Sequence, residues 1–210
     1  MFLADWLYRI IKFCYYLKDQ EFTQCDLVVP LGYALLPQKE LPDAEEKILG
    51  EAARIALEYQ TPIAWVSADY LWPGCDEEEN RLKINELRSA GVTIAPIIGE
   101  GVIDTVTEAQ SIKKVVAEAG LQPRTIVVVT DWPHARRARR IWKKAFPEST
   151  IIMRSVEGKW DKSHPNFSAR SNMRWLLANI AYHFLFIVVR EKGTVLLAGL
   201  LRRKDNKKGV

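Results

Sequence analysis

The sequence has little cysteine: only Cys14, Cys25 and Cys75 occur in 210 residues, at wide spacings. An odd number of cysteines without a Cys-x-x-Cys pair excludes a disulfide framework and offers no zinc knuckle. Histidine is equally scarce, and because His164 and His183 are far apart in the sequence, no metal site is expected. Unpaired thiols fit a reducing compartment, so the cytoplasm is the predicted location.

Several well-known signatures are also missing. The sequence contains no Gly-x-Gly-x-x-Gly, no P-loop and no Gly-x-Ser-x-Gly. It therefore lacks the common sequence signatures of nucleotide-binding sites and of hydrolases. A secretory signal is not predicted either, because residues 1–20 carry Asp5 and Arg9 inside their apolar stretch and lack a small-residue cleavage site. We expect this first segment to form an amphipathic helix.

The C-terminal part contains two apolar runs. Trp175 to Val189 is fifteen residues long, whereas a helix that spans a bilayer needs roughly 20. This run is therefore predicted to be a buried helix, with membrane contact as the alternative. The run from Thr194 to Leu201, which a basic tail follows, is also typical of a segment that lies on an anionic membrane surface. Peripheral membrane contact through these C-terminal segments stays open.

The composition fits one globular domain. Hydrophobic residues make up 48% of the chain and charged residues 27%, which is enough apolar material for one substantial core. The net charge is +4, with Lys and Arg concentrated in residues 136–144 and in the tail at 202–208. No recognised nucleic-acid-binding module accompanies these clusters, so a nucleic-acid partner is not expected.

Short apolar runs alternate with longer segments of helical period, which predicts βαβ units and a parallel sheet. The predicted strands are Asp26–Leu31, Ile63–Ser67, Val92–Ile97, Thr125–Thr130 and Thr150–Met153. The predicted helices between them are Asp43–Tyr59, Glu77–Ala90, Thr105–Ala119 and His134–Ala145. We therefore expect one α/β domain over residues 1–210, with a core at 26–153: a Rossmann-like, open, mostly parallel sheet of about five strands flanked by helices. Residues 155–210, a loop, the apolar helix and the basic tail, form a C-terminal helical extension.

The loop after the third predicted strand is a candidate site. In an open parallel sheet, ligands bind beyond the carboxyl ends of the strands, where helix N-termini point outward. This loop places Asp104, Thr105 and Glu108 at a helix start, with Thr105 and Glu108 on one face. The alternative is a capping box, because Thr105-x-x-Glu108 fits the Ser/Thr-x-x-Glu pattern that satisfies backbone donors at a helix start.

The loop after the fourth predicted strand is the more specific feature. Thr130 and Asp131 end the strand, and His134, Arg136 and Arg137 follow near the helix start. Cations at a helix N-terminus oppose the helix dipole, so their placement favours a function, namely holding a phosphate or carboxylate. His134 is a candidate acid or base near neutral pH. The alternative is a solvated basic face in which His134 only caps the helix.

The two loops together resemble a known family. Asp104-Thr105-x-x-Glu108-Ala109, followed by Thr130-x-x-x-His134-x-x-Arg137-Ala138, is similar to the paired signatures of the YdcF, SanA and ElyC-like family, domain of unknown function 218. The resemblance covers residues 26–153. It implies a Rossmann-like sheet with a pocket at its carboxyl edge and a link to bacterial cell-envelope biogenesis. It also implies a nucleotide or an adenosyl compound such as S-adenosylmethionine as the cofactor to consider.

The turns after the first two predicted strands depart from the family pattern. They read Pro-Leu-Gly-Tyr at residues 30–33 and Ser-Ala-Asp-Tyr at residues 67–70, whereas relatives have glycine-rich turns here. With one glycine between them, these turns offer fewer places where the backbone can approach a phosphate closely. Gly32 and Ser67 are still expected to line the site.

The leading hypothesis is an enzyme or ligand-binding domain for an anionic small molecule, such as a nucleotide, a sugar phosphate or a lipid-linked saccharide. Arg136 and Arg137 would hold the anion. Asp104 and Glu108 would orient hydroxyl groups, and His134 would transfer a proton, which makes these three the candidate catalytic residues. The alternative hypothesis is a peripheral membrane or scaffold protein of the envelope without catalysis.

Overall fold

The computed structural model describes residues 2–68, 74–99 and 104–187. In chain order the elements are α1 (Phe2–Tyr15), β1 (Leu27–Pro30), α2 (Asp43–Tyr59), β2 (Ala64–Trp65), α3 (Cys75–Ser89), β3 (Ile97–Ile98), α4 (Thr105–Glu118), β4 (Thr125–Asp131), α5 (Trp132–Ala145), β5 (Thr150–Val156) and the 3-10 helix η1 (Phe167–Arg170). Residues 172–187 are also helical and are called the C-terminal helix below. The predicted run Thr194–Leu201 and the basic tail lie outside the described residues.

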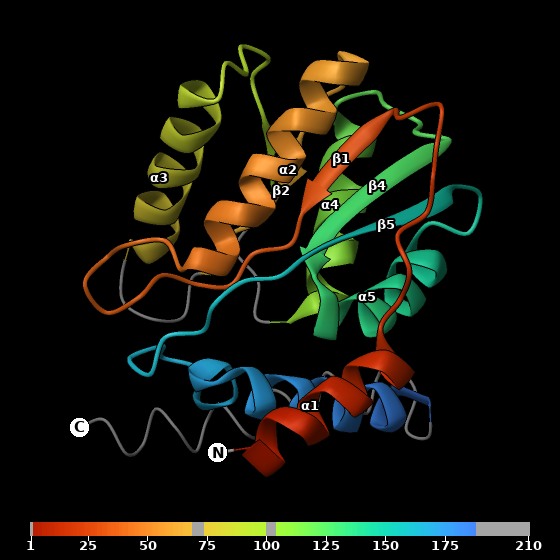
Figure 1. The fold of residues 1–210 in the computed structure, drawn as a ribbon. Helices are drawn as coiled ribbons and strands as arrows, with labels where there is room; N and C mark the ends of the chain where they lie inside the picture. The colour runs from red at the N-terminus through yellow and green to blue at the C-terminus, as the bar shows by residue number, and fades with distance from the viewer. Residues whose placement is uncertain (1, 69–73, 100–103, 188–210) are drawn as a thin grey trace.

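The strands are parallel and form two small sheets (Figure 1). One has the order β1-β4-β5, and the other pairs β2 with β3. An isolated parallel bridge between Val28 and Ile63 links the two, and the Val28 N–H donates to the Pro62 carbonyl at 3.0 Å. The predicted α/β class is confirmed, but the predicted sheet of about five strands is found only as a three-stranded and a two-stranded sheet.

Of the five predicted strands, the third has the least accurate bounds. The sequence predicts Val92–Ile97, whereas β3 contains only Ile97 and Ile98. Pro96 lies immediately before β3 and has no N–H to donate to a neighbouring strand, so the ladder begins after it. The β2–β3 pairing is therefore limited to two residue pairs, and these strands form a separate sheet because only the Val28–Ile63 bridge joins β2 to β1.

Both faces of β1 and β4 are buried. Leu27 and Val128 belong to an apolar cluster that includes residues of α4 and α5. Val28 and Val127 belong to a second cluster that includes residues of α2. Strands covered on both faces read as continuous apolar runs, which is why the sequence predicts Thr125–Thr130 clearly. Figure 1 shows helices on both sides of these strands.

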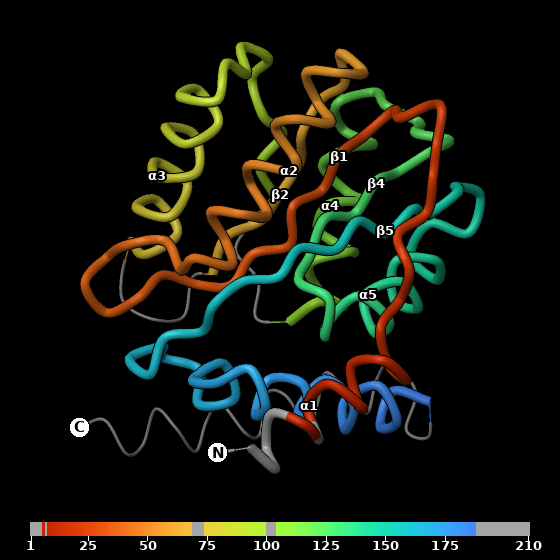
Figure 2. The backbone as a smooth tube through the Cα atoms, viewed as in Figure 1, coloured from red at the N-terminus to blue at the C-terminus, as the bar shows by residue number. Residues whose placement is uncertain are grey.

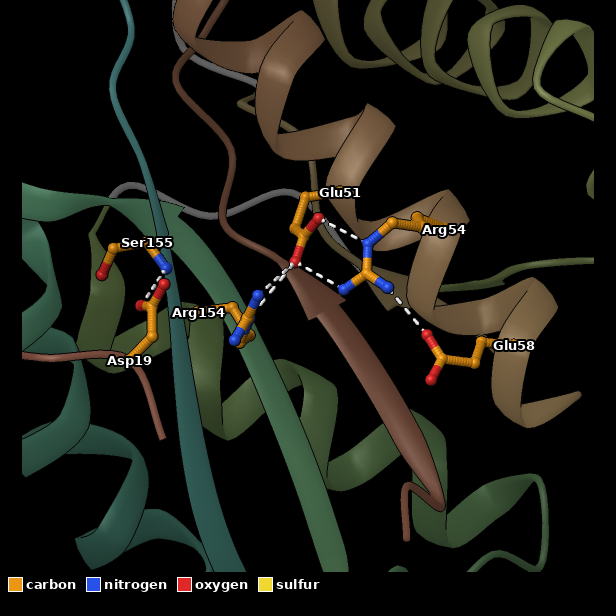
Figure 3. Close-up of polar contacts among 6 residues, drawn as sticks. All are labelled: Asp19, Glu51, Arg54, Glu58, Arg154 and Ser155. Atoms are coloured by element: carbon orange, nitrogen blue, oxygen red, sulfur yellow. Dashed lines mark hydrogen bonds and ion pairs between the residues drawn. The ribbon is translucent and has the colours of Figure 1, made fainter. Parts of the chain in front are cut away.

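The edge strand β5 is tied to its surroundings by charged side chains (Figure 3). The Ser155 N–H donates to Oδ1 of Asp19 at 2.9 Å, so a carboxylate covers a donor on the open edge of the sheet. Arg154 binds Glu51 of α2 at 3.1 Å, and Glu51 also accepts from Arg54 at 2.9 Å. These contacts hold the segment after α1 and the helix α2 against β5.

After β5 the chain crosses to the C-terminal helix and passes the start of α2 (Figure 2). The Lys159 N–H donates to Oδ2 of Asp43 at 2.6 Å. A Cβ atom placed on Gly158 would lie 2.3 Å from Cβ of Ala44. The crossing therefore needs glycine at this position because α2 lies too close for any side chain.

We expect Gly158→Ala to lower the free energy of unfolding by about 1–3 kcal/mol, because the methyl group must displace the start of α2. Gly50→Ala is the matched control. Gly50 lies inside α2, and a methyl group added there would meet no atom within 4 Å, so alanine should raise stability by about 0.5–1 kcal/mol. Urea denaturation of both variants measures the two effects. Equal stabilities of the two variants would contradict the close approach.

The terminal helices cover the carboxyl ends of the strands, at the bottom of Figure 1. The amphipathic helix predicted at residues 1–20 is found as α1, which ends earlier than predicted, at Tyr15. The sequence predicted that the C-terminal helix is buried, but only one of its faces is. Trp175 and Phe186 are buried, whereas Leu177 and Phe184 are exposed. Among the residues that the structure describes, no helix combines the length and the apolar character needed to cross a membrane.

Candidate functional site

Seven of the ten predicted site residues meet at the carboxyl ends of β1 and β4. The residues in contact there, called the carboxyl-edge cluster below, are Gly32, Tyr33, Thr105, Glu108, Thr130, Asp131, His134 and Arg137. They come from the turn after β1, the first turn of α4, the end of β4 and the start of α5. The two loops that the sequence singled out therefore lie side by side, as predicted.

The start of α4 is capped by Asp104. Its Oδ1 accepts from the N–H groups of Val106 and Thr107 at 2.8 and 2.9 Å, and the Thr107 hydroxyl accepts from the Asp104 N–H at 3.3 Å. The capping box therefore consists of Asp104 and Thr107, and the alternative of a box between Thr105 and Glu108 is wrong. Thr105 and Glu108 are free to face the strands, where both are buried.

His134 lies at the centre of the cluster. Its Nε2 is 2.9 Å from Nη2 of Arg137 and 3.2 Å from Oγ1 of Thr105. Its Nδ1 is 2.9 Å from the hydroxyl of Tyr33. A guanidinium can only donate, so Nε2 accepts and Nδ1 carries the proton, which it donates to Tyr33 or to Thr130 at 3.2 Å.

The pKa of His134 lies well below its usual range, because the side chain is buried and the Arg137 cation is next to it. The imidazole is therefore neutral at physiological pH and both of its nitrogens have partners. This differs from the sequence-based expectation of an acid or base that titrates near neutral pH. In this geometry His134 positions Arg137, Thr105 and Tyr33 rather than exchanging protons with solvent.

Tyr33 and Trp175 are two members of the site that the sequence did not reveal. The Tyr33 hydroxyl donates to Oδ1 of Asp131, and the Trp175 indole N–H donates to Oδ2 at 2.6 Å. Burial raises the pKa of Asp131 to about 7, although these two hydrogen bonds and Arg137 oppose the rise. Tyr33 directly follows Gly32, a predicted site residue, so its position in the sequence could have identified it as a candidate. Nothing in the apolar segment that contains Trp175 indicated a site.

Arg137 is held without a carboxylate partner. Its Nε donates to Oδ1 of Asn179 at 3.2 Å, its Nη2 donates to His134, and its guanidinium lies 5.5 Å from the ring centroid of Tyr182. Throughout residues 2–68, 74–99 and 104–187, no Asp or Glu oxygen lies within 4.0 Å of it. A half-buried cation without a counter-charge can bind an anion.

Glu108 borders a second buried group that the sequence did not reveal. Lys83 of α3 is fully buried, and its Nζ lies 2.6 Å from Glu79 and 3.0 Å from Glu45. These three residues are called the buried ion triad below. Glu108 accepts from the Gly32 N–H at 3.4 Å, and burial raises its pKa to about 8, which Gly32 and Lys83 partly oppose.

The ion triad also supports the turn after β1. A Cβ atom on Gly32 would lie 2.9 Å from Nζ of Lys83 and 3.4 Å from Oε1 of Glu79. The other oxygen of Glu79 accepts from the N–H of Ala68 at 3.1 Å. One buried lysine therefore joins the turns that follow β1 and β2, and glycine is needed at position 32 because the ammonium group occupies the space.

Three predicted residues have other partners. Ser67 donates to Oδ1 of Asn80 at 2.8 Å, next to the ion triad rather than to His134. Arg136 turns away from the cluster and donates to the carbonyls of Tyr15 at 2.5 Å and Tyr16 at 3.3 Å. The cation thus satisfies the C-terminal end of α1, where it complements the helix dipole. Asp104, a predicted catalytic residue, serves as the helix cap through Oδ1.

A surface cavity of about 300 Å³ opens next to the cluster, between α1 and the ends of β4 and β5. Its lining residues are Lys12, Tyr16, Trp132, Ser155, Val156 and Glu157. Lys12 and Glu157 form an ion pair of 2.6 Å in this wall. In the described residues, no group of three or more His, Cys, Asp and Glu side chains is arranged to hold a metal ion.

Comparison of the chain with protein-family models, with curated proteins and with solved structures finds no match.

Proposed function

We propose that this chain is a YdcF-like, Rossmann-related domain that binds an anionic small molecule at the carboxyl-edge cluster. The ligand classes that fit are a nucleotide, an S-adenosylmethionine-like compound, and a sugar phosphate or lipid-linked saccharide. A role in cell-envelope biogenesis belongs to the same proposal and rests on the resemblance of the two loop motifs alone.

The strand order supports this proposal. If the Val28–Ile63 bridge is counted as a contact between strands, the order becomes β3-β2-β1-β4-β5. This is the order of doubly wound dinucleotide-binding sheets, which bind ligands where the order reverses, between the first and fourth strands. Gly32 follows β1 and Asp131 ends β4. The carboxyl-edge cluster therefore occupies the position at which such sheets bind ligands.

The observation that carries the proposal is the unbalanced charge of Arg137. Its guanidinium is fixed by His134 and Asn179 but faces no carboxylate among the described residues. The starts of α4 and α5 meet at the 3.2 Å contact between Thr105 and His134. Asp104 already accepts from the first N–H groups of α4, so the positive N-terminal end of α5 and the Arg137 cation are the groups that favour an anion here.

The arrangement supports binding more directly than catalysis. His134 holds Arg137 in place, and the Thr105 hydroxyl is a further donor or acceptor for a ligand group. Glu108 has a raised pKa and is largely protonated near neutral pH, so it does not repel an anion. We assign no reaction to this site.

The test is thermal unfolding of the full chain with ATP, ADP, S-adenosylmethionine, a UDP-sugar, a hexose phosphate or inorganic phosphate. A compound that binds the folded state raises the melting temperature in proportion to the logarithm of its concentration over its Kd. We expect at least one phosphate-bearing compound to do so. Arg137→Gln should weaken its binding by about 10- to 100-fold, because a charge-assisted hydrogen bond is lost.

Arg140→Gln is the matched control, since Arg140 is an exposed arginine of the same helix. It should respond to the compound as the natural chain does. Each variant is compared with its own melting temperature without ligand, which removes any effect of the substitution on stability. If no compound shifts the natural chain, or if Arg137→Gln shifts as much as the natural chain does, the proposal is wrong.

A further inference from the structure

The two terminal helices expose large apolar side chains. On α1, Trp6, Ile10 and Phe13 are 61%, 41% and 88% exposed and lie at the i, i+4, i+7 spacing of one helix face. On the C-terminal helix, Leu177 and Phe184 are 51% and 61% exposed and lie two turns apart. Neither set contributes to the apolar core, so both need another explanation.

The opposite face of each helix packs on the domain. On α1, Tyr8 lies edge-on to Trp132 with 5.6 Å between ring centroids, and Lys12 lies 5.4 Å from the same ring. On the C-terminal helix, Trp175 and Asn179 are buried against the carboxyl-edge cluster. Both helices are therefore amphipathic, and their exposed apolar faces point away from the strands.

The two helices lie alongside each other. Near its middle α1 contacts the start of the C-terminal helix, where Tyr8 lies close to Asn172. At its end α1 contacts the later part of that helix, where the rings of Tyr15 and His183 are 6.2 Å apart. Figure 1 shows both in one layer below the strands. We call their joint outer surface the terminal-helix face; it consists of Trp6, Ile10, Phe13, Leu177 and Phe184.

Two arginines lie at the border of this face. Arg9 on α1 and Arg174 on the C-terminal helix are exposed. The Arg174 guanidinium lies 4.5 Å from the ring centroid of Phe167, which is itself 62% exposed. In sequence, α1 and residues 172–187 together contain a single acidic residue, Asp5. The terminal-helix face is thus apolar and aromatic at its centre and basic at its margin.

We propose that the terminal-helix face docks the protein on an anionic lipid surface. Amphipathic helices with aromatic side chains on one face and basic residues beside them lie in the headgroup region of such membranes. A second copy of the chain is the competing occupant. A two-fold contact through this face would gather Arg9 and Arg174 of both copies around one interface, and the like charges oppose that contact. An anionic bilayer complements both arginines.

The experiment is flotation of the full chain with vesicles of phosphatidylcholine alone or with about 30% phosphatidylglycerol. We expect binding to the anionic vesicles that weakens as salt is added. The double variant Phe13→Ser, Leu177→Ser should partition at least about tenfold more weakly, because each apolar side chain loses its burial in the membrane. The double variant Arg9→Gln, Arg174→Gln should lose about fivefold for each charge, and only on anionic vesicles.

Leu57→Ser is the matched control, since Leu57 is a 40% exposed leucine on α2 and not on the terminal helices. It should bind vesicles as the natural chain does. Three outcomes overturn the proposal. The first is no binding to either vesicle, and the second is unchanged binding by Phe13→Ser, Leu177→Ser. The third is a dimer in solution that the same double variant dissociates, because the face would then lie between two copies.

Discussion

At about pH 8.5 the variant Glu108→Gln is expected to be more stable than the natural chain by several kcal/mol, and at about pH 5 the two should be nearly equal. In the folded chain, burial raises the pKa of Glu108 from 4.5 to about 8. A raised pKa means that the protonated side chain favours the folded state. Its contribution is complete below about pH 4.5 and is lost as the pH rises through 8.

The size of this effect follows from the linkage between protonation and folding. Each tenfold change in an acidity constant corresponds to about 1.4 kcal/mol, and the rise in the pKa of Glu108 covers more than three such steps. Glutamine cannot ionise, yet its side-chain oxygen can still accept from the Gly32 N–H. Asp131, with a pKa raised to about 7, should leave a smaller pH dependence of the same sign in the variant.

Urea denaturation across this pH range measures the difference. Glu118→Gln is the control, because Glu118 is an exposed glutamate on the same helix, and it should leave the slope of stability against pH unchanged. If natural chain and Glu108→Gln lose stability in parallel between about pH 5 and pH 8.5, then Glu108 is not buried as described.

The helices were predictable because they carry local signals. The period of apolar residues places α2 at Asp43–Tyr59 in both sequence and structure. Gly91 and Gly120 have φ angles of 92° and 73°, as expected of glycines that end helices. The short strand β3 was less predictable because its extent depends on pairing with β2 and on Pro96, whose missing N–H acts only once a neighbouring strand is present.

The sequence predicted where in the fold the site lies, but it did not predict all the residues that form it. The strands of a parallel sheet have their carboxyl ends at one edge, so the loops that hold Thr105 and His134 were expected at the same edge. Their contact depends in addition on the packing of α4 against α5. Arg136 was misplaced because the sequence does not show that α1 docks beside α5. Trp175 comes from a helix far along the chain and enters the site only through tertiary packing.

Lys83 is the clearest case of a residue that sequence could not assign. It lies in α3, among Asp, Glu, Asn and Arg residues, and this polar composition predicts a solvated helix. In the fold its ammonium group is fully buried between two carboxylates. The carboxylates raise the pKa of Lys83, so it stays charged despite its burial.

Lys83→Met is therefore expected to lower the free energy of unfolding by about 3–5 kcal/mol, because Glu45 and Glu79 lose their counter-charge while they remain buried. This is a large part of the stability of an ordinary domain. Lys47→Met is the control, since its ion pair with Asp43 is solvent-exposed and should contribute less than about 1 kcal/mol. Urea denaturation at neutral pH compares the two variants.

A triple variant separates loss of the charge from loss of the fold. Lys83→Met combined with Glu45→Gln and Glu79→Gln removes all three charges and keeps the side chains close to their natural size. Replacement of a whole buried ion group is often neutral or stabilising, whereas removal of one partner is costly. We expect the triple variant to recover most of the lost stability even if Lys83→Met alone does not fold. If the triple variant is no more stable than Lys83→Met, the cost comes from packing around the lysine stem, and the buried ion triad does not hold the turns after β1 and β2 by its charge.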